Sequence, residues 1–226
     1  MAVRKLIINA DDLGLSPGVN AGILEAHTRG VVTSASLMVL ERAAQEAADA
    51  TSGYAALSLG LHFVDDGSGD LDDPAQAARS FREQLERFRQ LTSRDPTHVD
   101  SHHHVHTASP ARLATFVGLV EPLGVPLRGH GRVGWVGAFW AQWEIGVTNL
   151  RYVSSRFLLH LVRSQVRDGV TEIGCHPARV IGDFRSSYLQ ERAVELTTLT
   201  EPGLREAIER LGVELVSFHA CQTSSP

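Results

Sequence analysis

Carboxylate and imidazole side chains follow several short apolar segments of this chain. The segment Lys5–Ala10 runs directly into Asp11 and Asp12, and two later apolar segments end at His62 and His176. Two adjacent carboxylates are unfavourable unless a cation lies between them or one of them is protonated. An Asp with two His suits a hard or borderline divalent cation with open positions, and such a cation lowers the pKa of bound water towards about 7. The pair therefore predicts one metal-ligating Asp beside one that acts as a base, although a solvated turn or helix cap is the plainer alternative.

Histidines are concentrated in one segment. The chain has 11, and five of them lie within Thr97–Thr107. If a strand continues through this segment, side-chain alternation puts one set of residues on a single face: His98, Asp100, His102, His104 and His106. One ion cannot use all of these ligands, so we expect His104 and His106 in a loop beyond the strand, in contact with substrate. A group of ordinary surface histidines is the alternative.

Three further side chains are weaker candidates. His176 precedes Pro177, which ends the strand, and a lone histidine there also has a structural interpretation. Cys175 faces the opposite side of that strand, which argues against a Cys-His nucleophilic pair. Arg128 stands near the end of a predicted strand and could hold a carboxylate or a catalytic Asp. Trp140 offers a face on which a sugar could stack, although the spacing of the neighbouring aromatic residues equally suits a buried helix stripe, which we favour.

Short β-rich segments alternate with stretches of helical periodicity. The predicted strands are Lys5–Ala10, Val31–Val39, Leu57–Phe63, His98–His104, Val125–Gly129, Thr148–Val153, Val170–His176 and Glu214–Phe218. The predicted helices are Val19–Arg29, Ala43–Ala50, Pro74–Leu91, Pro110–Leu123, Arg156–Arg167, Leu189–Leu199 and Gly203–Leu211. Strict alternation implies parallel strands joined by crossovers. Because ligand sites in such folds lie at the carboxyl ends of the strands, the candidate side chains should meet at one rim.

Composition narrows the class of protein. The chain has 226 residues, of which 43% are hydrophobic, so a sizeable core and an α/β barrel are within its reach. Lys and Arg number 21 against 26 Asp and Glu, and no basic stretch suits a nucleic acid. Cys175 and Cys221 form no CxxC pair. The apolar run after Lys5 is too short for a signal peptide or membrane span, so we expect a cytoplasmic protein.

Several motifs of the chain resemble those of the YdjC-like carbohydrate deacetylases. This family includes the chitooligosaccharide deacetylase and the hopanoid-associated deacetylase. The resemblance runs through nearly the whole chain, and its motifs occur in the same order. They are Leu6–Ser16 followed by Val19–Ile23 and Gly30–Met38, then Gly60–His62, His98–His106 and Glu172–Pro177.

The resemblance implies a TIM-like (β/α) barrel as a single domain, here residues 1–221, with a short tail at 222–226. It also implies one divalent metal ion, Mg or Zn, held by Asp12, His62 and His102. Asp11 would be the general base and His176 the general acid in removing the acetyl group from an N-acetylated sugar or glycoconjugate.

The chain departs from the family pattern in two ways. Leu13 stands where the family usually has Phe, and the segments Asp65–Asp95 and Gly129–Arg167 are short beside those of typical members. Loops on this face of a barrel shape the substrate pocket. We therefore expect an open pocket for a bulky substrate, or a homodimer in which a partner subunit supplies the missing wall.

Two other functions stay open at this stage. A metal-dependent phosphoesterase or amidohydrolase on a similar barrel would usually carry His-x-His at the end of the first strand, where this chain has Asp11 and Asp12. A metal-binding regulatory relative without turnover would be expected to have lost catalytic positions, and all of them are occupied here.

Overall fold

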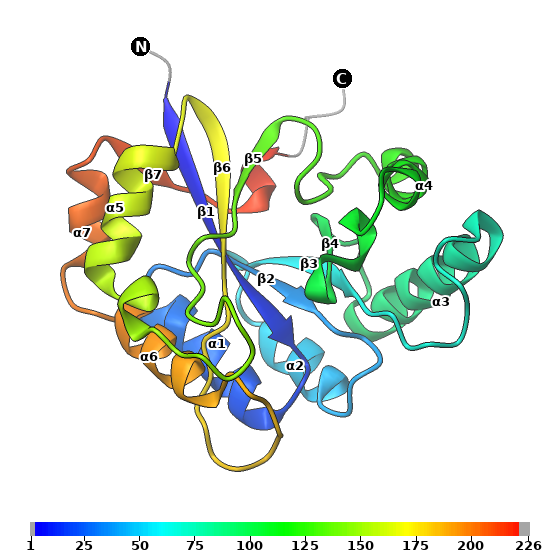
Figure 1. Ribbon diagram of the computed structural model, residues 1–226, viewed down its shortest axis with the longest axis horizontal. Helices are drawn as coiled ribbons and strands as arrows, with labels where there is room; N and C mark the ends of the chain where they lie inside the picture. Colours follow the sequence, from blue (N-terminus) through cyan, green and yellow to red (C-terminus); the bar gives the residue numbers. More distant parts are fainter. Residues whose placement is uncertain (1–2, 222–226) are drawn as a thin grey trace.

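Strand β1 (Arg4–Leu13) is the centre of the sheet in the computed structural model, which describes residues 3–221 (Figure 1). It is buried from Leu6 onwards, as expected of a strand covered on both faces. One edge pairs with β6 (Gly169–Cys175). The other edge pairs first with β7 (Val213–Leu215) and then with β2 (Ser34–Leu37). All of these pairs are parallel.

The sheet is open. Its seven strands include three not yet described, β3 (Ser58–Phe63), β4 (Val99–Ser101) and β5 (Val133–Val136). The order across the sheet is β4-β3-β2-β1-β6-β5, and β7 lies beside β1. Within residues 3–221 no pairing joins β5 back to β4, so the strands form a half-barrel. The predicted α/β class with parallel strands is confirmed, and the closed TIM-like barrel is not.

One predicted strand on the open side does not form. The segment Val125–Gly129 makes a single bridge, between Leu127 and Val99. Pro126 has no N–H group to give to a ladder, and Gly129 turns the chain with a left-handed φ of 71°. The segment therefore lies beside β4 without extending the sheet.

A second predicted strand, Thr148–Val153, is instead a 3-10 helix at Leu150–Val153, which the side chain of Asn149 caps. Strand β5, which was not predicted, forms the edge of the sheet beside β6. It is short, and its Trp135 packs across Gly174 of β6, where a Cβ would lie 2.6 Å from the indole. Only the neighbouring strand shows why an indole fits there.

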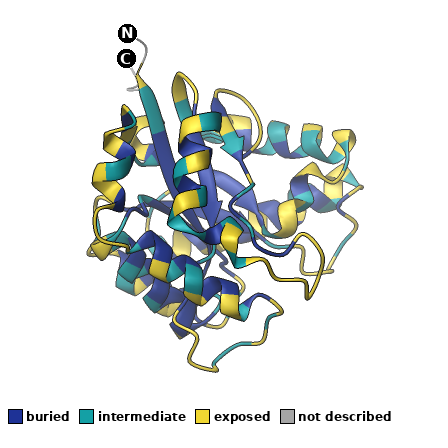
Figure 2. Ribbon diagram, turned by 60° about the vertical axis from the view of Figure 1, so that its left-hand side comes forward, coloured by how far each residue is buried: buried dark blue, intermediate teal, exposed yellow. Residues whose placement is uncertain are grey.

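The helices follow the predicted ranges to within a few residues and cover the outer side of the sheet (Figure 1). They are α1 (Pro17–Arg29), α2 (Ala44–Thr51), α3 (Pro74–Thr92), α4 (Pro110–Val120), α5 (Ser155–Gln165), α6 (Leu189–Leu199) and α7 (Leu204–Glu209). Side chains of Ser16, Asp73, Ser109 and Ser154 cap four of them, each by accepting a backbone hydrogen bond. Buried faces point towards the sheet and exposed faces point outwards (Figure 2).

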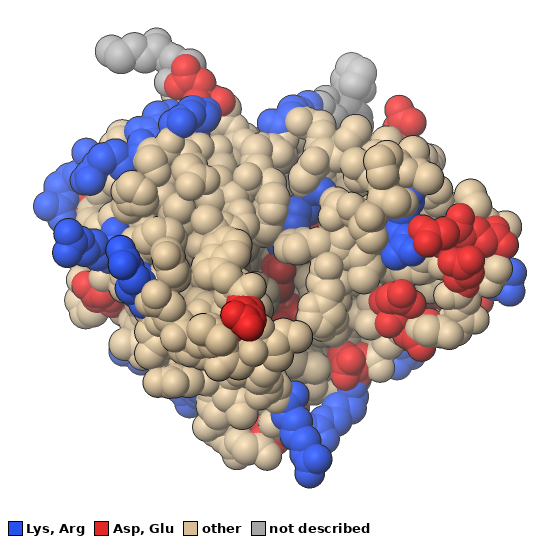
Figure 3. Space-filling model, viewed as in Figure 1, with Lys and Arg blue, Asp and Glu red and all other residues tan. Residues whose placement is uncertain are grey.

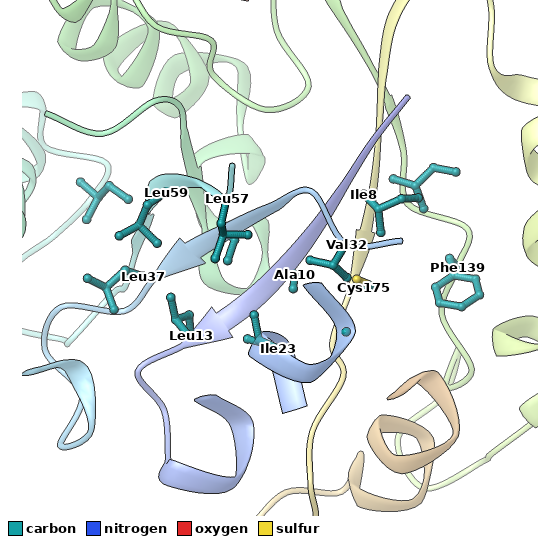
Figure 4. Packing of buried hydrophobic residues seen from close by; sticks show 14 of the residues in the cluster. Ile8, Ala10, Leu13, Ile23, Val32, Leu37, Leu57, Leu59, Phe139 and Cys175 are labelled. Carbon is teal, nitrogen blue, oxygen red and sulfur yellow. The ribbon is translucent and has the colours of Figure 1, made fainter. Parts of the chain in front are cut away.

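A large hydrophobic core lies between the sheet and the helices (Figure 4). Ile8, Ala10 and Leu13 of β1 and Ile23 of α1 are fully buried in it, and burial of each large aliphatic side chain contributes about 1.5–3 kcal/mol. Cys175 belongs to this core, where its thiol donates to a main-chain oxygen of β1 and burial raises its pKa. A nucleophilic role for this thiol has no support.

The main core draws on segments from Leu6 to Val213, in agreement with a single domain. None of the helices within residues 3–221 is long and apolar enough to cross a lipid bilayer. The tail predicted at 222–226 lies outside the described residues.

A glycine in β3 leaves room for a buried histidine. A Cβ on Gly60 would lie 2.3 Å from the imidazole of His98, which is stacked on Phe218 with ring centroids 3.8 Å apart. We expect Gly60→Ala to lower the free energy of unfolding by about 1–3 kcal/mol, because the ring must shift within a packed core. Urea unfolding measures this change. The control is Gly118→Ala in α4, where a Cβ meets no atom within 4 Å. If both variants match the parent protein, the packing argument is wrong.

Candidate active site

The end of β1 brings two carboxylates to one site. Asp11 and Asp12 are both buried, with 3% and 1% of their surfaces exposed. Consecutive side chains of a regular strand point to opposite faces. Here the pairing with β2 is irregular between Ala10 and Leu13, and Asp12 has a left-handed φ of 66°. Such a conformation costs a non-glycine residue of order 1–3 kcal/mol, and strain of this kind is concentrated at functional sites.

Asp12, His62 and His102 lie together. Oδ1 of Asp12 is 3.3 Å from Nε2 of His62, at the end of β3, and 3.0 Å from Nδ1 of His102, just after β4. One ligand atom of each residue lies within 4.8 Å of the others. The structure thus groups the three residues that the resemblance implied as metal ligands.

Asp100 fixes the orientation of His62. The two residues face each other in the register of β3 and β4, and Nδ1 of His62 lies 2.6 Å from Oδ1 of Asp100. A carboxylate on one ring nitrogen of a metal-ligating histidine leaves the other free for the metal. In the sequence Asp100 stands among the histidines, but only the strand register shows that it pairs with His62.

The charge of the site favours a cation. Four buried carboxyl groups lie here with two buried guanidinium groups: Asp11, Asp12, Asp100, Glu172, Arg128 and Arg192. Burial alone would lower the pKa of His62, but Asp100 and Asp12 raise it to about 10. A positive charge is therefore stabilised at the point where the ligand atoms meet, and the carboxylate with two imidazoles fits a divalent ion.

Arg128 holds Asp11. Its guanidinium bonds both carboxylate oxygens of Asp11, at 2.6 and 2.7 Å, and also bonds Glu172 and Asp100. Burial would raise the pKa of Asp11, but Arg128 outweighs burial and the pKa is lowered. Asp11 is therefore an ionised carboxylate in fixed geometry. The face of Trp135 lies 4.3 Å from this guanidinium. Glu172 was missed as a member of the site.

Arg192 of α6 also belongs to the site, although the sequence did not predict it. Its guanidinium bonds Oδ2 of Asp12, the oxygen turned away from the two imidazoles. Burial would raise the pKa of Asp12, but Arg192 and the neighbouring histidines hold it well below its usual range. No sequence motif surrounds Arg192, and it reaches the site from a helix that is 180 positions away in the chain.

His176 stands at the end of β6, opposite the metal-ligand group. Its Nε2 is 3.8 Å from Oδ2 of Asp11. Burial lowers the pKa of His176 to about 4, so its imidazole is neutral near neutral pH. This separation is longer than a hydrogen bond, so Asp11 and His176 could exchange a proton only through a bridging water or substrate atom.

The histidine segment does not continue as a strand. β4 ends at Ser101, and the next residues form a 3-10 helix, His102–Thr107, in which His103 and His104 have left-handed φ angles of 53° and 54°. The predicted alternation therefore fails after Ser101. His104 is exposed, with its ring 5.5 Å from that of Trp135, and keeps its place as a candidate for substrate contact.

His106 does not fit the predicted substrate contact. Its ring is fully buried, with Nδ1 2.5 Å from the Ser101 hydroxyl and Nε2 3.0 Å from the carbonyl oxygen of Arg128. Because both ring nitrogens are engaged within the chain, His106 supports the segment that carries Arg128. The sequence pattern could not separate it from its exposed neighbour His104.

The aromatic segment is a loop and does not form the helix stripe that we favoured. Phe139 is buried, Trp140 is half-buried and Trp143 is 65% exposed. The indole of Trp140 lies 4.9 Å from the His176 ring, and Tyr188 stacks on one of its faces at 3.9 Å. Trp140 therefore lies at the site, with one face already covered.

The site reaches one face of the molecule through His102 and His176, whose side chains are 30% and 21% exposed. Figure 3 shows a hollow near the middle of this face, with acidic and basic side chains inside it, in the region where Figure 1 shows β1 and β4. The carboxyl ends of parallel strands meet at such an edge, as the alternation of strands and helices predicted.

Comparison with known proteins gives the chain a family. A sequence profile of the YdjC-like proteins matches residues 5–210. A carbohydrate deacetylase from Geobacillus stearothermophilus is 35% identical, covering 95% of this chain and 97% of its own. A chitooligosaccharide deacetylase from Yersinia pestis is 32% identical, covering 96% and 99%.

A solved structure is also similar over its whole length. It is a protein from Enterococcus faecalis V583 described as a candidate cellobiose-phosphate cleavage protein, with a TM-score of 0.82 and 26% identity, covering 98% of this chain and 100% of its own. These matches run through all the strands that carry the site. The resemblance seen in the motifs is confirmed, and the chain belongs to the YdjC-like protein family.

Proposed function

We propose that the protein is a metal-dependent hydrolase that removes the acetyl group from an N-acetylated amino sugar or its glycoside. The proposal rests on one observation. A group of possible metal ligands, Asp12, His62 and His102, lies beside the fixed carboxylate of Asp11 and the neutral imidazole of His176. Relatives at 35% and 32% identity are named as deacetylases of carbohydrates and chitooligosaccharides.

Asp12, His62 and His102 would hold one divalent ion, for which Mg and Zn are the candidates. When bound, such an ion supplies Lewis-acid polarisation of the acetyl carbonyl and lowers the pKa of water. Asp12 is suited to this role because Arg192 holds one of its oxygens and leaves the other towards the imidazoles.

Asp11 is the base in this proposal. Arg128 keeps its carboxylate ionised and oriented, so it can accept a proton from the attacking water. His176 is the acid. Its Nε2 lies 3.8 Å from Oδ2 of Asp11, which is longer than a hydrogen bond, so the proton would reach the neutral imidazole through a bridging water and pass from there to the leaving nitrogen. Water adds to the acetyl carbon, the C–N bond breaks, and acetate and a free amino sugar result.

Acetate release from a panel of N-acetylated sugars tests the function. Acetate is expected from at least one of diacetylchitobiose and larger N-acetylglucosaminyl compounds. Phosphate release from phosphosugars without acetate would instead support a phosphoesterase. If neither product forms with Mg or Zn present, the protein is better described as a regulatory relative without turnover.

The substrate is predicted to be bulkier than a simple disaccharide. The short segments Asp65–Asp95 and Gly129–Arg167 motivate this prediction, and the loop that carries Trp140 ends in exposed apolar side chains, with Trp143 65% and Ile145 90% exposed. Recognition should then depend on fewer contacts close to the acetyl group. We expect kcat/KM for bulky N-acetylglucosaminyl conjugates, such as lipid or natural-product glycosides, to equal or exceed that for diacetylchitobiose.

That comparison also addresses the homodimer. A strong preference for the plain disaccharide, with inert conjugates, would contradict an open pocket and would favour a wall supplied by a partner subunit. Light scattering at the assay concentration would then show whether a second copy is bound. The deacetylase proposal survives either result.

A further inference from the structure

The ring of His176 lacks the hydrogen bond that commonly orients a catalytic imidazole. Its Nδ1 is buried and has no hydrogen-bond partner within residues 3–221. Which ring nitrogen carries the proton is usually set by the bond that the other one makes. The orientation of His176 must therefore come from the packing of its ring and from its main chain.

Two aromatic rings pack against His176. The Trp140 ring meets it edge-on at 4.9 Å and 69°, and the Tyr188 ring meets it at 5.9 Å and 72°. The two aromatic rings stack on each other at 3.9 Å and 3°. This stacked pair, which we call the aromatic clamp, limits the rotation of the imidazole.

Glu195 of α6 ties the clamp to the main chain of His176. It is fully buried, and its Oε2 accepts a hydrogen bond from the N–H of His176 at 2.5 Å. Its Oε1 accepts from the hydroxyl of Tyr188 at 2.7 Å. That hydroxyl in turn accepts from the N–H of Ala141, next to Trp140, at 3.1 Å. One carboxyl group thus joins α6, the end of β6 and the loop that carries Trp140.

A buried carboxyl group is costly unless it is hydrogen-bonded. Glu195 has its two bonding partners at the clamp and at His176, and burial raises its pKa to about 8. An apolar residue would pack α6 against the sheet without this cost. The position of the carboxyl group therefore points to a role in the site.

Given the proposed function, we propose that Glu195, Tyr188 and Trp140 are positioning residues that hold the His176 ring for protonation of the leaving nitrogen. None of the three needs to touch the reacting atoms. Their effect on turnover should pass entirely through His176.

A double-mutant cycle tests this inference. Tyr188→Phe keeps the ring stack and removes the hydroxyl that joins Ala141 to Glu195. We expect it to lower kcat for acetate release about 10-fold, a part of the ~10²–10⁴-fold that a positioned acid contributes, with KM within about twofold of the parent value. In a His176→Ala background the same substitution should have no further effect. Glu195→Gln should behave in the same way, and Tyr188→Phe keeps the test valid if Glu195→Gln does not fold.

The matched control is Thr198→Val. Thr198 is buried on the same helix and donates to the carbonyl oxygen of Val153 at 2.7 Å, away from His176. The Thr198→Val variant should have a lower free energy of unfolding but the same kcat for acetate release as the parent protein. If Tyr188→Phe lowers kcat equally with and without His176, or changes KM alone, the positioning role is overturned. Failure of the parent protein to release acetate would overturn the proposed function, which is a separate result.

Discussion

Asp11→Asn is expected to lower kcat for acetate release by ~10²–10⁴-fold, the usual contribution of a positioned base. Asn has nearly the same shape and cannot accept the proton of the attacking water. Arg128 would keep its bonds to Glu172 and Asp100, so the site should retain its fold. The measurement is steady-state kinetics on the best substrate of the panel, together with urea unfolding.

The variant should still bind the metal, because Asp11 is not in the proposed ligand group. Metal content and KM close to those of the parent protein would separate loss of the base from loss of the site. Asp95→Asn is the matched control, since this carboxylate pairs with Arg89 on the surface at 2.7 Å. Near-parental turnover by Asp11→Asn would exclude Asp11 as the base.

We expect each of the variants Asp12→Ala, His62→Ala and His102→Ala to lose most of the bound metal. Each change deletes one of three ligand atoms that lie within 4.8 Å of one another. The affinity should fall by more than the roughly 10–100-fold that loss of an outer partner costs. In Asp100→Asn the His62 ring is held less firmly, so the metal affinity of this variant should fall by roughly 10–100-fold. Elemental analysis and calorimetric titration with Zn measure occupancy and Kd.

His104→Ala is the control for these ligand variants. It belongs to the same histidine segment but is exposed and absent from the ligand group. Its Kd for the metal should match that of the parent protein. If all three ligand variants keep full occupancy with unchanged Kd, the assignment of the metal site is wrong.

The sequence was sufficient to predict the site residues that stand at the ends of strands. Asp11, Asp12, His62 and His176 each follow an apolar run, and in a parallel sheet such positions share one edge. The structure places all four there. Local patterns could predict this because it requires only the strands, their direction and the residue that follows each of them.

Contacts between distant segments could not be predicted in this way. Arg192 reaches Asp12 across 180 positions, and Glu195 lies beside His176 because α6 packs over the end of β6. Helical periodicity gave α6 its correct range, but not the reason for its buried charged residues. Arg192 and Glu195 bond residues at the strand ends, and Glu191 bonds Gln142 and Thr148 of the loop after β5. These contacts exist only once the helix has docked.

The tertiary structure also decided between neighbours of the same type. His104 and His106 are identical side chains two positions apart, yet the left-handed turn at His103 and His104 leaves one exposed and buries the other beneath Arg128. In the same way, two short β-rich segments failed to close a barrel, since pairing needs a partner with a matching ladder as well as a β-prone sequence. The sequence alone determined which chemical groups stand at the rim of the sheet. Packing and backbone geometry determined which of them face the site and what holds them there.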